Sequence, residues 1–335
     1  MSATIKDIAK RLRISPSTVS RALNNKPGIS KKTISAVNIM ANKLNYKRNS
    51  LAVSLRQDKS FCIGVVVPWI SNYFFAEAIS GIEHVAFCAG YQIIIAQTND
   101  DEEEEKRALQ ALTSSRVDGI LLSTGSKVKG VSHIRAIQKE VPIVLFDRTI
   151  KRLKLSGIGA EDYRGAYEMT KHLIKSGKRK IVHLSGPKNV EIAMNRLSGY
   201  KSALSKHKIP FKRHLVIDCD FNESLVHPTI TKLISEGVEF DALFASNDDM
   251  AVQAIISLKK YGKKVPEDIA VAGFGNYPVS KIVNPQLSTV NHQPKEIGIQ
   301  ATKVLLNQID QLTPVVNLII KSELILRDSS CNSVD

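Results

Sequence analysis

From residue 61 onward, short runs of β-branched apolar residues alternate with amphipathic segments, and this alternation restricts the fold more than any other feature. Near-continuous apolar runs of this kind are typical of buried parallel strands. A helical stripe between the first two runs predicts a β-α-β unit, and the whole pattern predicts two open parallel sheets. The runs lie at residues 63–67, 91–96, 119–123, 143–146, 181–186, 242–246 and 269–274.

The first 44 residues have a helical period instead. Residues 5–12 repeat apolar side chains at helical spacing behind Thr4, which can cap the first turn. Ser15 and Pro16 suit the N-cap and first position of a short second helix, and Ser30 suits the cap of a third. Three short helices with a tight turn between the first two predict a helix-turn-helix, whose second helix enters the major groove of DNA.

The positive charge of the chain is concentrated in this region. Of the net +15, residues 1–59 hold 13 lysines and arginines against Asp7 and Asp58. Such asymmetry is typical of a protein that binds a polyanion, because each neutralised phosphate releases counterions. A solvated basic tail is the alternative, and the apolar periodicity argues against it.

Several classes of protein are disfavoured by what the sequence lacks. It has no G-x-S-x-G elbow, Walker loop, G-x-G-x-x-G or His pair at metal-ligand spacing, so we expect no enzyme, no metal and no cofactor. Four scattered cysteines predict reduced thiols. Without a signal peptide or a run of about 18 apolar residues, a cytoplasmic location is expected.

The acidic run at residues 100–107 indicates a solvated helix start.

The N-terminal motifs TIKDIAKRLRISPSTVSRALNN, ISKKT and LNYKRNSLAVSLR resemble the headpiece and hinge of the LacI family of bacterial transcriptional regulators. The resemblance implies that Pro16 and Ser17 vary with operator sequence and that Arg21 reads guanine by a bidentate contact. The other headpiece positions would mainly contact phosphates. The expected DNA-binding set is Thr4, Ser15, Pro16, Ser17, Thr18, Ser20, Arg21, Asn24, Asn49, Ser50, Ala52 and Leu55.

The segment RNSLAVSLR, at residues 48–56, would be a linker on composition alone. In the resembling family it is a hinge helix that orders on the operator and inserts a leucine into the minor groove. Leu55 has that position here, and an apolar wedge that unstacks a base step fits it. Family members usually have proline where Arg48 stands, so a looser or more electrostatic entry into the hinge is expected.

The remainder resembles the sugar-sensing core of the same family, a type I periplasmic-binding-protein-like fold. The motifs are PWISNYFFAEAISGIE, FDR, RLSGY, SNDDMA, VAGFGN and PQLSTVNHQP. The resemblance implies a ligand cleft between two subdomains, with aromatic faces and bidentate polar groups suited to a polyol. The expected effector-binding residues are Phe74, Phe75, Asp147, Arg148, Arg196, Phe221, Asn247, Asp248 and Asn276.

Two departures from the family pattern restrict the ligand. Gly275 stands where an acidic residue often clamps the ligand, and Val190 and Ile192 replace the arginine and threonine of purine-binding members. A sugar or sugar acid is therefore expected, and Arg148 and Arg196 would tolerate an anionic group. With Arg196 expected at a helix start facing the cleft, Arg196→Ala should abolish the effector response while leaving stability near wild type.

The resulting fold class is multidomain: an all-α helix-turn-helix headpiece followed by an α/β core of two parallel-sheet subdomains. The expected boundaries are a DNA-binding domain at 1–47, a hinge and linker at 48–60, one subdomain at 61–160 plus 291–321, and the other at 161–290 plus 322–335. The expected function is a sequence-specific regulator, expected to be a repressor of carbohydrate-related genes, allosterically controlled by its effector.

The expected assembly is a homodimer on a pseudo-palindromic operator, because one short helix reads too few base pairs. A tetramer is not expected, because the C-terminal tail lacks apolar heptads. Two alternatives remain open at this stage. One is a sugar-binding transport or chemoreception protein, and the other is an enzyme on an open α/β core.

Overall fold

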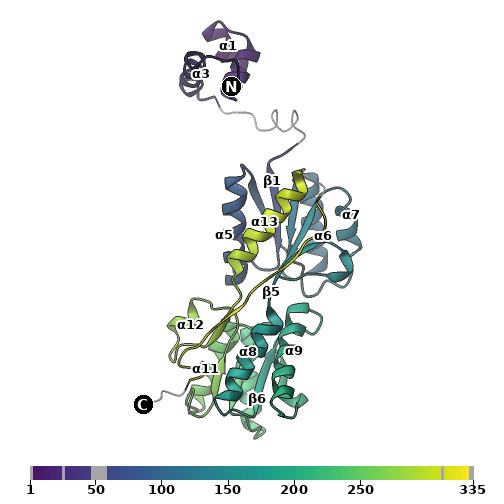
Figure 1. The fold of residues 1–335 in the computed structure, drawn as a ribbon, viewed down its shortest axis with the longest axis vertical. Helices are drawn as coiled ribbons and strands as arrows, with labels where there is room; N and C mark the ends of the chain where they lie inside the picture. The colour runs from purple at the N-terminus through teal and green to yellow at the C-terminus, as the bar shows by residue number, and fades with distance from the viewer. Residues whose placement is uncertain (1–2, 25–26, 47–58, 311–312, 332–335) are drawn as a thin grey trace. The chain divides into compact units, whose positions relative to one another are not determined.

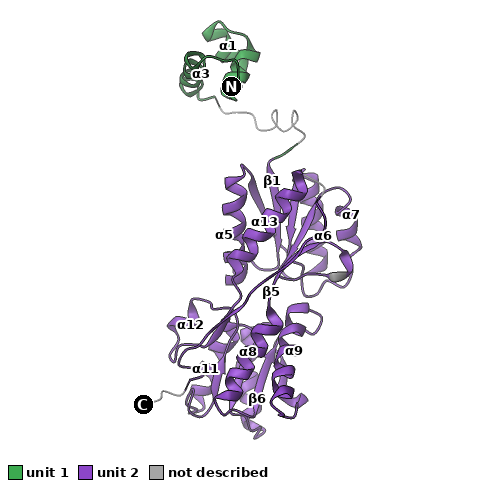
Figure 2. Ribbon diagram, viewed as in Figure 1, with its two compact units in different colours: residues 1–60 green, residues 61–335 purple. Residues whose placement is uncertain are grey.

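The structure is a computed structural model that describes residues 3–24, 27–46, 59–310 and 313–331. The chain divides into two compact units, Met1–Ser60 and Phe61–Asp335 (Figure 2). We call them unit 1 and unit 2 and describe each by itself. No helix of the described residues is both long enough and apolar enough to cross a membrane.

Unit 1 consists, in its described residues, of three helices around a small apolar core. The side chain of Thr4 accepts from the backbone N–H of Asp7, whose carboxylate accepts from the backbone of Thr4, so the expected cap is a complete capping box. Arg13 ends the first helix in the left-handed conformation at φ 52°. Ser15 and Ser30 cap the next two helices, as expected. The helices are α1 Ile5–Leu12, α2 Pro16–Leu23 and α3 Lys31–Lys43.

The first sheet of unit 2 is parallel and has six strands within the described residues. Their order is β11-β5-β4-β3-β1-β2, and Figure 1 labels β1 and β5 of this sheet. Helices α5 and α13 pack on one face and α6 and α7 on the other, because successive strand residues alternate between two apolar clusters. The strands are β1 Cys62–Val67, β2 Gln92–Gln97, β3 Gly119–Leu122, β4 Ile143–Phe146, β5 Ser156–Ala160 and β11 Asn317–Ile320; the helices are α5 Tyr73–Cys88, α6 Glu102–Ser114, α7 Ser132–Ile137 and α13 Pro294–Asp310.

Helices α5 and α13 approach each other closely at two glycines. A Cβ at Gly81 would lie 2.2 Å from the carbonyl oxygen of Lys295, and a Cβ at Gly298 would lie 2.1 Å from that of Ala78. Any side chain at these positions would push the helices apart. The contact therefore requires glycine on both helices.

The second sheet has four parallel strands among the described residues, in the order β7-β6-β8-β9. Helices α8 and α9 cover one face and α10 and α11 the other. Its strands are β6 Ile181–Ser185, β7 Val216–Asp218, β8 Ala242–Ala245 and β9 Ala270–Ala272; its helices are α8 Asp162–Lys175, α9 Glu191–Lys206, α10 Val226–Ser235, α11 Asp248–Lys260 and α12 Val279–Ile282, with 3₁₀ turns η2 Arg213–Leu215 and η3 Glu223–Leu225. The 3₁₀ turn η1 Lys151–Leu153 lies between β4 and β5 of the first sheet.

The chain passes between the two sheets of unit 2 three times. The passages lie between β5 and α8, between β10 (Thr289–Asn291) and α13, and between β11 and β12 (Glu323–Ile325). Strands β10 and β12 pair antiparallel in a separate ladder. We call the part built on the six-stranded sheet the N-lobe and the part built on the four-stranded sheet the C-lobe.

One strand differs from the expectation of burial. The run at 91–96 forms β2, but β2 is the edge strand of its sheet and most of its side chains are half-buried or exposed. Ile94 and Ile95 are 40% and 39% exposed. A run of isoleucines fits equally well a buried central strand and an edge strand that another surface covers, so composition could not separate the two.

Candidate functional site

The outer side of α2 presents small polar groups and one cation. Val19 and Ala22 are buried against the other helices, whereas Pro16, Ser17 and Arg21 are exposed. The short helix therefore has one face committed to packing and one available to a partner. This is the arrangement that major-groove recognition requires.

The hydroxyls at the start of α2 form a local network. The Ser15 hydroxyl accepts from the backbone N–H of Thr18 and lies 2.7 Å from the Ser17 hydroxyl and 2.8 Å from the Thr18 hydroxyl. At the other end, the side-chain amide of Asn24 donates to the carbonyl of Ser20 at 2.6 Å. The network holds these groups in fixed rotamers at the exposed end of the helix.

Arg21 is tied to the turn that follows α2. Its Nη2 donates to the carbonyl oxygen of Pro27 at 2.8 Å. The remaining N–H groups of the guanidinium stay available, and one contact to the turn limits the rotamers of the side chain. Of the other expected DNA-binding residues, Thr4 is exposed and paired with Asp7. Asn49, Ser50, Ala52 and Leu55 lie outside the described residues.

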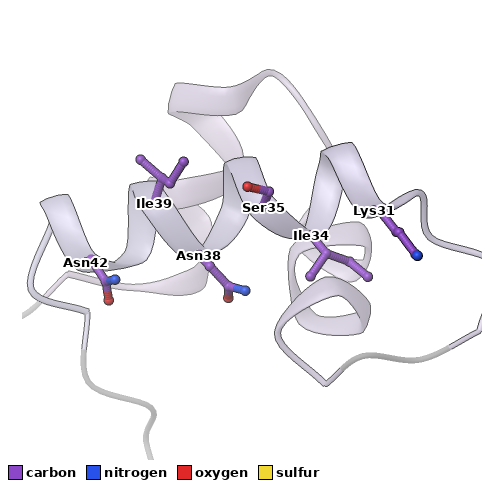
Figure 3. A pocket seen from close by; sticks show the side chains of 6 residues that line it. All are labelled: Lys31, Ile34, Ser35, Asn38, Ile39 and Asn42. Atoms are coloured by element: carbon purple, nitrogen blue, oxygen red, sulfur yellow. The ribbon is translucent and has the colours of Figure 1, made fainter.

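A second exposed surface of unit 1 follows α3 (Figure 3). Ile39 is 65% exposed there. A single helix lines this surface, so it is a shallow stripe with no opposing wall. It therefore lacks the concave shape of a small-molecule site. Its residues are Lys31, Ile34, Ser35, Asn38, Ile39 and Asn42.

Unit 2 has a cavity between its two lobes, which we call the effector pocket. Seven of the nine expected residues line it: Phe74, Phe75, Asp147, Arg148, Arg196, Phe221 and Asn247. Four more line it, of which the sequence had pointed only to Ile192, as a departure from the purine-binding pattern: Asn72, Ile192, Tyr277 and His292. The space measures about 50 Å³, far below the roughly 300 Å³ or more of typical small-molecule sites, so in this arrangement of the lobes the cavity is too small for a typical ligand.

Aromatic rings form one wall of the effector pocket. Phe74 stacks on His292 with ring centroids 5.0 Å apart and meets Phe75 edge to face at 5.1 Å. Burial lowers the pKa of His292 well below its usual value, which keeps the ring neutral. Tyr277, a buried lining residue, has its ring centroid 5.0 Å from that of Tyr73. These rings offer flat apolar faces of the kind that pack on the C–H faces of a sugar.

Both arginines of the effector pocket are already paired. Arg148 donates from Nη1 to Oδ1 of Asp100 at 2.5 Å, while its Nε is buried without a hydrogen-bond partner among the described residues. Arg196 donates to Asp162 at 2.7 Å and to the carbonyl of Ser246 at 2.5 Å. The positive charge of both guanidinium groups is therefore balanced by protein carboxylates.

Arg196 is placed differently from the expectation. It lies inside α9, five residues after the helix begins, with a side chain only 5% exposed. Its guanidinium carbon lies 3.8 Å from the ring centroid of Phe274. This burial replaces the expectation that Arg196→Ala leaves stability near wild type with the opposite prediction, a loss of stability, because the substitution would strand the buried carboxylate of Asp162.

Asp147 is the carboxylate that faces the cavity. Burial raises its pKa to about 7, although the neighbouring Arg148 lowers it. Its Oδ2 lies 3.9 Å from Nε of Arg148, which is too long for a hydrogen bond. The group can thus accept from a ligand hydroxyl when ionised and donate to one when protonated.

Asn247 is held by two bonds at the start of α11. Its Oδ1 accepts from the backbone N–H of Met250, and its Nδ2 donates to the carbonyl of Phe221. It therefore fixes the position of the aromatic wall at Phe221. The expectation placed Asn247 at the ligand, and the structure adds this positioning contact.

Two expected residues do not line the effector pocket. Asp248 accepts from the backbone of Tyr277 and from the hydroxyl of Thr289, and burial raises its pKa to about 7. Asn276 accepts from Arg327 at 2.8 Å. Both side chains are used by the C-lobe itself. Asp248 thereby holds the backbone of Tyr277, which does line the pocket.

The acidic run before and within α6 is more than a solvated helix start, so that expectation is corrected. Asp100 bonds to the backbone N–H of Ser126 as well as to Arg148. Glu105 is fully buried and accepts from the N–H of Gly125, with His133 at 2.8 Å. These carboxylates hold the loop after β3 beside the pocket. The acidic sequence at residues 100–107 could not by itself predict these hydrogen bonds, because their partners lie far away in the sequence.

In the part of the chain that the structure describes, hydrogen bonds join the lobes near the pocket. The Thr149 hydroxyl donates to the carboxylate of Glu191 at 3.3 Å, and the side-chain amide of Asn189 donates to the carbonyl of Ser126.

Among the described residues, no group of three His, Cys, Asp or Glu side chains could hold a metal ion.

An amphipathic recognition helix with a two-lobed core around a polar and aromatic cavity defines a ligand-responsive DNA-binding protein. The comparisons are specific about its family. The model described as "Bacterial regulatory proteins, lacI family" matches residues 4–49, and that for periplasmic binding proteins and the sugar binding domain of the LacI family matches 60–327. The chain belongs to the LacI family of bacterial transcriptional regulators. It is a DNA-binding regulator and not an enzyme.

The chain is similar to curated repressors over nearly its full length. It is 32% identical to the ribose operon repressor of Halalkalibacterium halodurans, over 92% of this chain and 91% of that protein. It is also 32% identical to the probable HTH-type transcriptional repressor ExuR of Bacillus subtilis, over 97% and 98%.

Solved structures share the fold. A lac repressor dimer bound to operator and the anti-inducer ONPF matches with a TM-score of 0.89 at 23% identity, covering 98% of this chain and 99% of that one. A complex of the transcriptional regulator CelR with cellobiose matches with a TM-score of 0.75 at 25% identity, again over 98% and 99%. The helix-turn-helix and the two parallel-sheet lobes expected from the sequence are therefore confirmed.

Proposed function

We propose that this regulator is controlled by an uncharged carbohydrate bound in the effector pocket. The observation that carries the proposal is the pairing of Arg148 with Asp100 and of Arg196 with Asp162. Among the described residues that line the cavity there is no uncommitted cation, while Asp147 adds a carboxylate. An anionic sugar would therefore meet no uncompensated positive charge, and transferring its carboxylate from water would be costly.

Hydroxyl-bearing ligands suit the groups that remain. The Nε of Arg148 can donate to a ligand oxygen, and the carboxyl of Asp147 can take part in hydrogen bonds to hydroxyls. Apolar Ile192 lines the cavity and offers no hydrogen bond to a purine. The relatives named as ribose operon repressors, and the CelR structure titled as a cellobiose complex, support a neutral sugar.

The same proposal gives the two units their roles. Residues 1–47 bind operator DNA, with Pro16, Ser17 and Arg21 facing the base pairs and Thr4, Ser15, Thr18, Ser20 and Asn24 at the backbone. Residues 48–60 are the hinge. The N-lobe, 61–160 plus 291–321, and the C-lobe, 161–290 plus 322–335, separate and close around the effector. Its place of action is the cytoplasm, where the operator is.

The regulator acts as a homodimer through one side of unit 2. Phe87 is 73% exposed on α5 and Ile282 is 80% exposed at the end of α12, and these helices lie on the same side of unit 2 in Figure 1. Ile94 and Ile95 are further exposed apolar side chains, on the edge strand β2. Exposed apolar side chains that gather on one side of a protein are typical of an interaction surface. The relative titled as a lac repressor dimer supports the assembly.

The direct test is a matched ligand panel. The chain is heated with ribose, cellobiose and other neutral sugars, and with the corresponding sugar acids, and the melting temperature is recorded. A specific ligand at about 100 times its dissociation constant adds roughly 2.7 kcal/mol of stability. A neutral sugar that stabilises the chain and shifts its operator affinity supports the proposal. A panel in which only sugar acids or purines act would contradict it.

A further inference from the structure

Another cavity lies entirely within the C-lobe. It measures about 220 Å³ at the edge strand β7, between the start of the loop after β6 and the outer side of α9. Leu197, Phe211 and Val216 form an apolar floor and wall. It shares no lining residue with the effector pocket. We call it the basic cavity.

Three cations surround the basic cavity: Lys188, Lys201 and Arg213. None of them forms an ion pair within 4.0 Å in the part of the chain that the structure describes. Elsewhere in unit 2 the lysines of helix surfaces often do so, as Lys106 does with Glu102 and Glu103. The one carboxylate at the cavity is that of Asp218, so the lining has a net positive charge.

The cations come from three separate elements and are partly oriented. The Lys201 ammonium on α9 lies 4.8 Å from the ring centroid of Phe211, a cation–π distance. Arg213 donates from Nη1 to the carbonyl of Val216 at 3.0 Å, which leaves its other N–H groups for a ligand. Lys188 follows β6 in the loop before α9. Cationic side chains that come from different elements and converge over an apolar floor can contact one anion from several directions. Lysines along one helix surface cannot do this.

We propose that the basic cavity binds a small phosphate monoester. The phosphate would contact Lys201, Arg213 and Lys188, and the carbon part would rest on Leu197 and Phe211. A monoester carries between one and two negative charges near neutral pH, which suits three cations opposed by one carboxylate. The cavity is smaller than the roughly 300 Å³ of drug-sized sites, which restricts the ligand to a compact one.

The effector pocket lies close to this site. A Cβ on Gly186, which lines the basic cavity, would lie 2.3 Å from the ring of Phe221, which lines the effector pocket. The two sites are thus separated by the contact between one glycine and one ring. Because the two linings are otherwise distinct, variants of the basic cavity test this site and not the proposed carbohydrate site.

The experiment is calorimetric titration of the full-length chain with phenyl phosphate, with phenol and inorganic phosphate as partial probes. Wild type should bind phenyl phosphate more tightly than phenol. Lys201→Gln and Arg213→Gln should each weaken phenyl phosphate binding on the order of tenfold, because each removes a charge-assisted contact. Both side chains are exposed, so neither change should unfold the protein.

Two control variants isolate the site. Lys206→Gln removes an exposed charge at the end of the same helix, outside the cavity, and should leave binding unchanged. Asp218→Asn removes the opposing carboxylate and should tighten phenyl phosphate binding several-fold, the reverse of the lysine effect. The cations of unit 1 are the same in every variant, so their contribution cancels. Equal losses in Lys201→Gln and Lys206→Gln, or wild-type affinity in the Lys201→Gln, Arg213→Gln double variant, would overturn the proposal.

Discussion

Arg196 donates from Nε to Oδ1 of Asp162 at 2.7 Å, and the two side chains are only 5% and 4% exposed. The pair joins the first turn of α8 to the second turn of α9. The same guanidinium bonds to the carbonyl of Ser246 after β8 and stacks on Phe274 after β9. One side chain thus connects the helices of one face of the C-lobe to the ends of its strands.

Arg196→Ala should destabilise unit 2 by about 3 to 5 kcal/mol, because it leaves the Asp162 carboxylate buried and unpaired. Urea denaturation followed by circular dichroism measures this. The control is Arg164→Ala, which removes an exposed arginine 3.6 Å from Glu161 at the start of α8 and should cost less than about 1 kcal/mol. Similar losses in both variants would show that the buried pair has no special role.

The DNA-binding role predicts a different result for Arg21→Ala. The substitution should weaken operator binding by about 1 to 3 kcal/mol and relax specificity at one base pair in each half-site. Lys32→Ala, at the exposed start of α3, should instead weaken operator and random DNA equally. Both are measured by gel-shift titration at fixed salt. If Arg21→Ala also weakens the two DNAs equally, Arg21 is a phosphate contact.

The helices of unit 1 could be predicted from sequence because their signals are local. Thr4, Ser15 and Ser30 each cap the turn that follows them, and Pro16 stands where its missing N–H costs nothing. The central strands of unit 2 were equally clear, since β1, β3 and β4 are continuous apolar runs buried on both faces.

Other elements and contacts have no such signal. Strand β5, with the sequence SGIGA, has little apolar side chain, and β7 and β12 have only three residues each. The ion pair of Asp100 with Arg148 spans 48 residues, and that of Asp162 with Arg196 spans 34. Such pairs depend on which strand ends meet in the fold. Sequence could therefore place both arginines at the site but could not show that their charges are compensated.

The raised pKa of Asp147 predicts that the stability of the fold depends on pH. Burial raises its pKa from 3.8 to about 7, so between those values the folded state holds a proton that the unfolded state has released. Its contribution to stability is fully present below about pH 4 and is lost as the pH rises toward 7, with a slope of at most about 1.4 kcal/mol per pH unit. Asp248 contributes in the same direction. Asp147→Asn should flatten this slope, as measured by urea denaturation between pH 4.5 and 8. Glu236→Gln, at the exposed end of α10, should not, and an unchanged slope in Asp147→Asn would contradict the assignment.

The proposed dimer predicts that a charge on its apolar surface dissociates it. Ile282→Glu and Phe87→Glu should each produce monomers at micromolar concentration in sedimentation equilibrium, because an isolated carboxylate would be buried in the interface. Ile39→Glu changes an isoleucine of unit 1 that is 65% exposed and should leave the assembly intact. Dimers that persist in both variants of unit 2 would place the interface elsewhere, and a wild-type tetramer would contradict the expected stoichiometry.

The charge balance of the effector pocket predicts that ligand preference can be changed by one isosteric substitution. Asp100→Asn keeps an oxygen for the backbone N–H of Ser126 but leaves the charge of Arg148 uncompensated. A sugar acid should then gain affinity by about tenfold, or roughly 1.4 kcal/mol, relative to its neutral parent sugar. Calorimetric titration of both ligands measures the ratio. Asp101→Asn is the matched control, because it removes the adjacent charge, retains an N-cap for α6 and does not contact Arg148. If the two variants shift the ratio equally, the effect is the general field of the acidic run. If neither shifts it, Arg148 does not face the part of the ligand that carries the charge, and the preference for a neutral sugar has another origin.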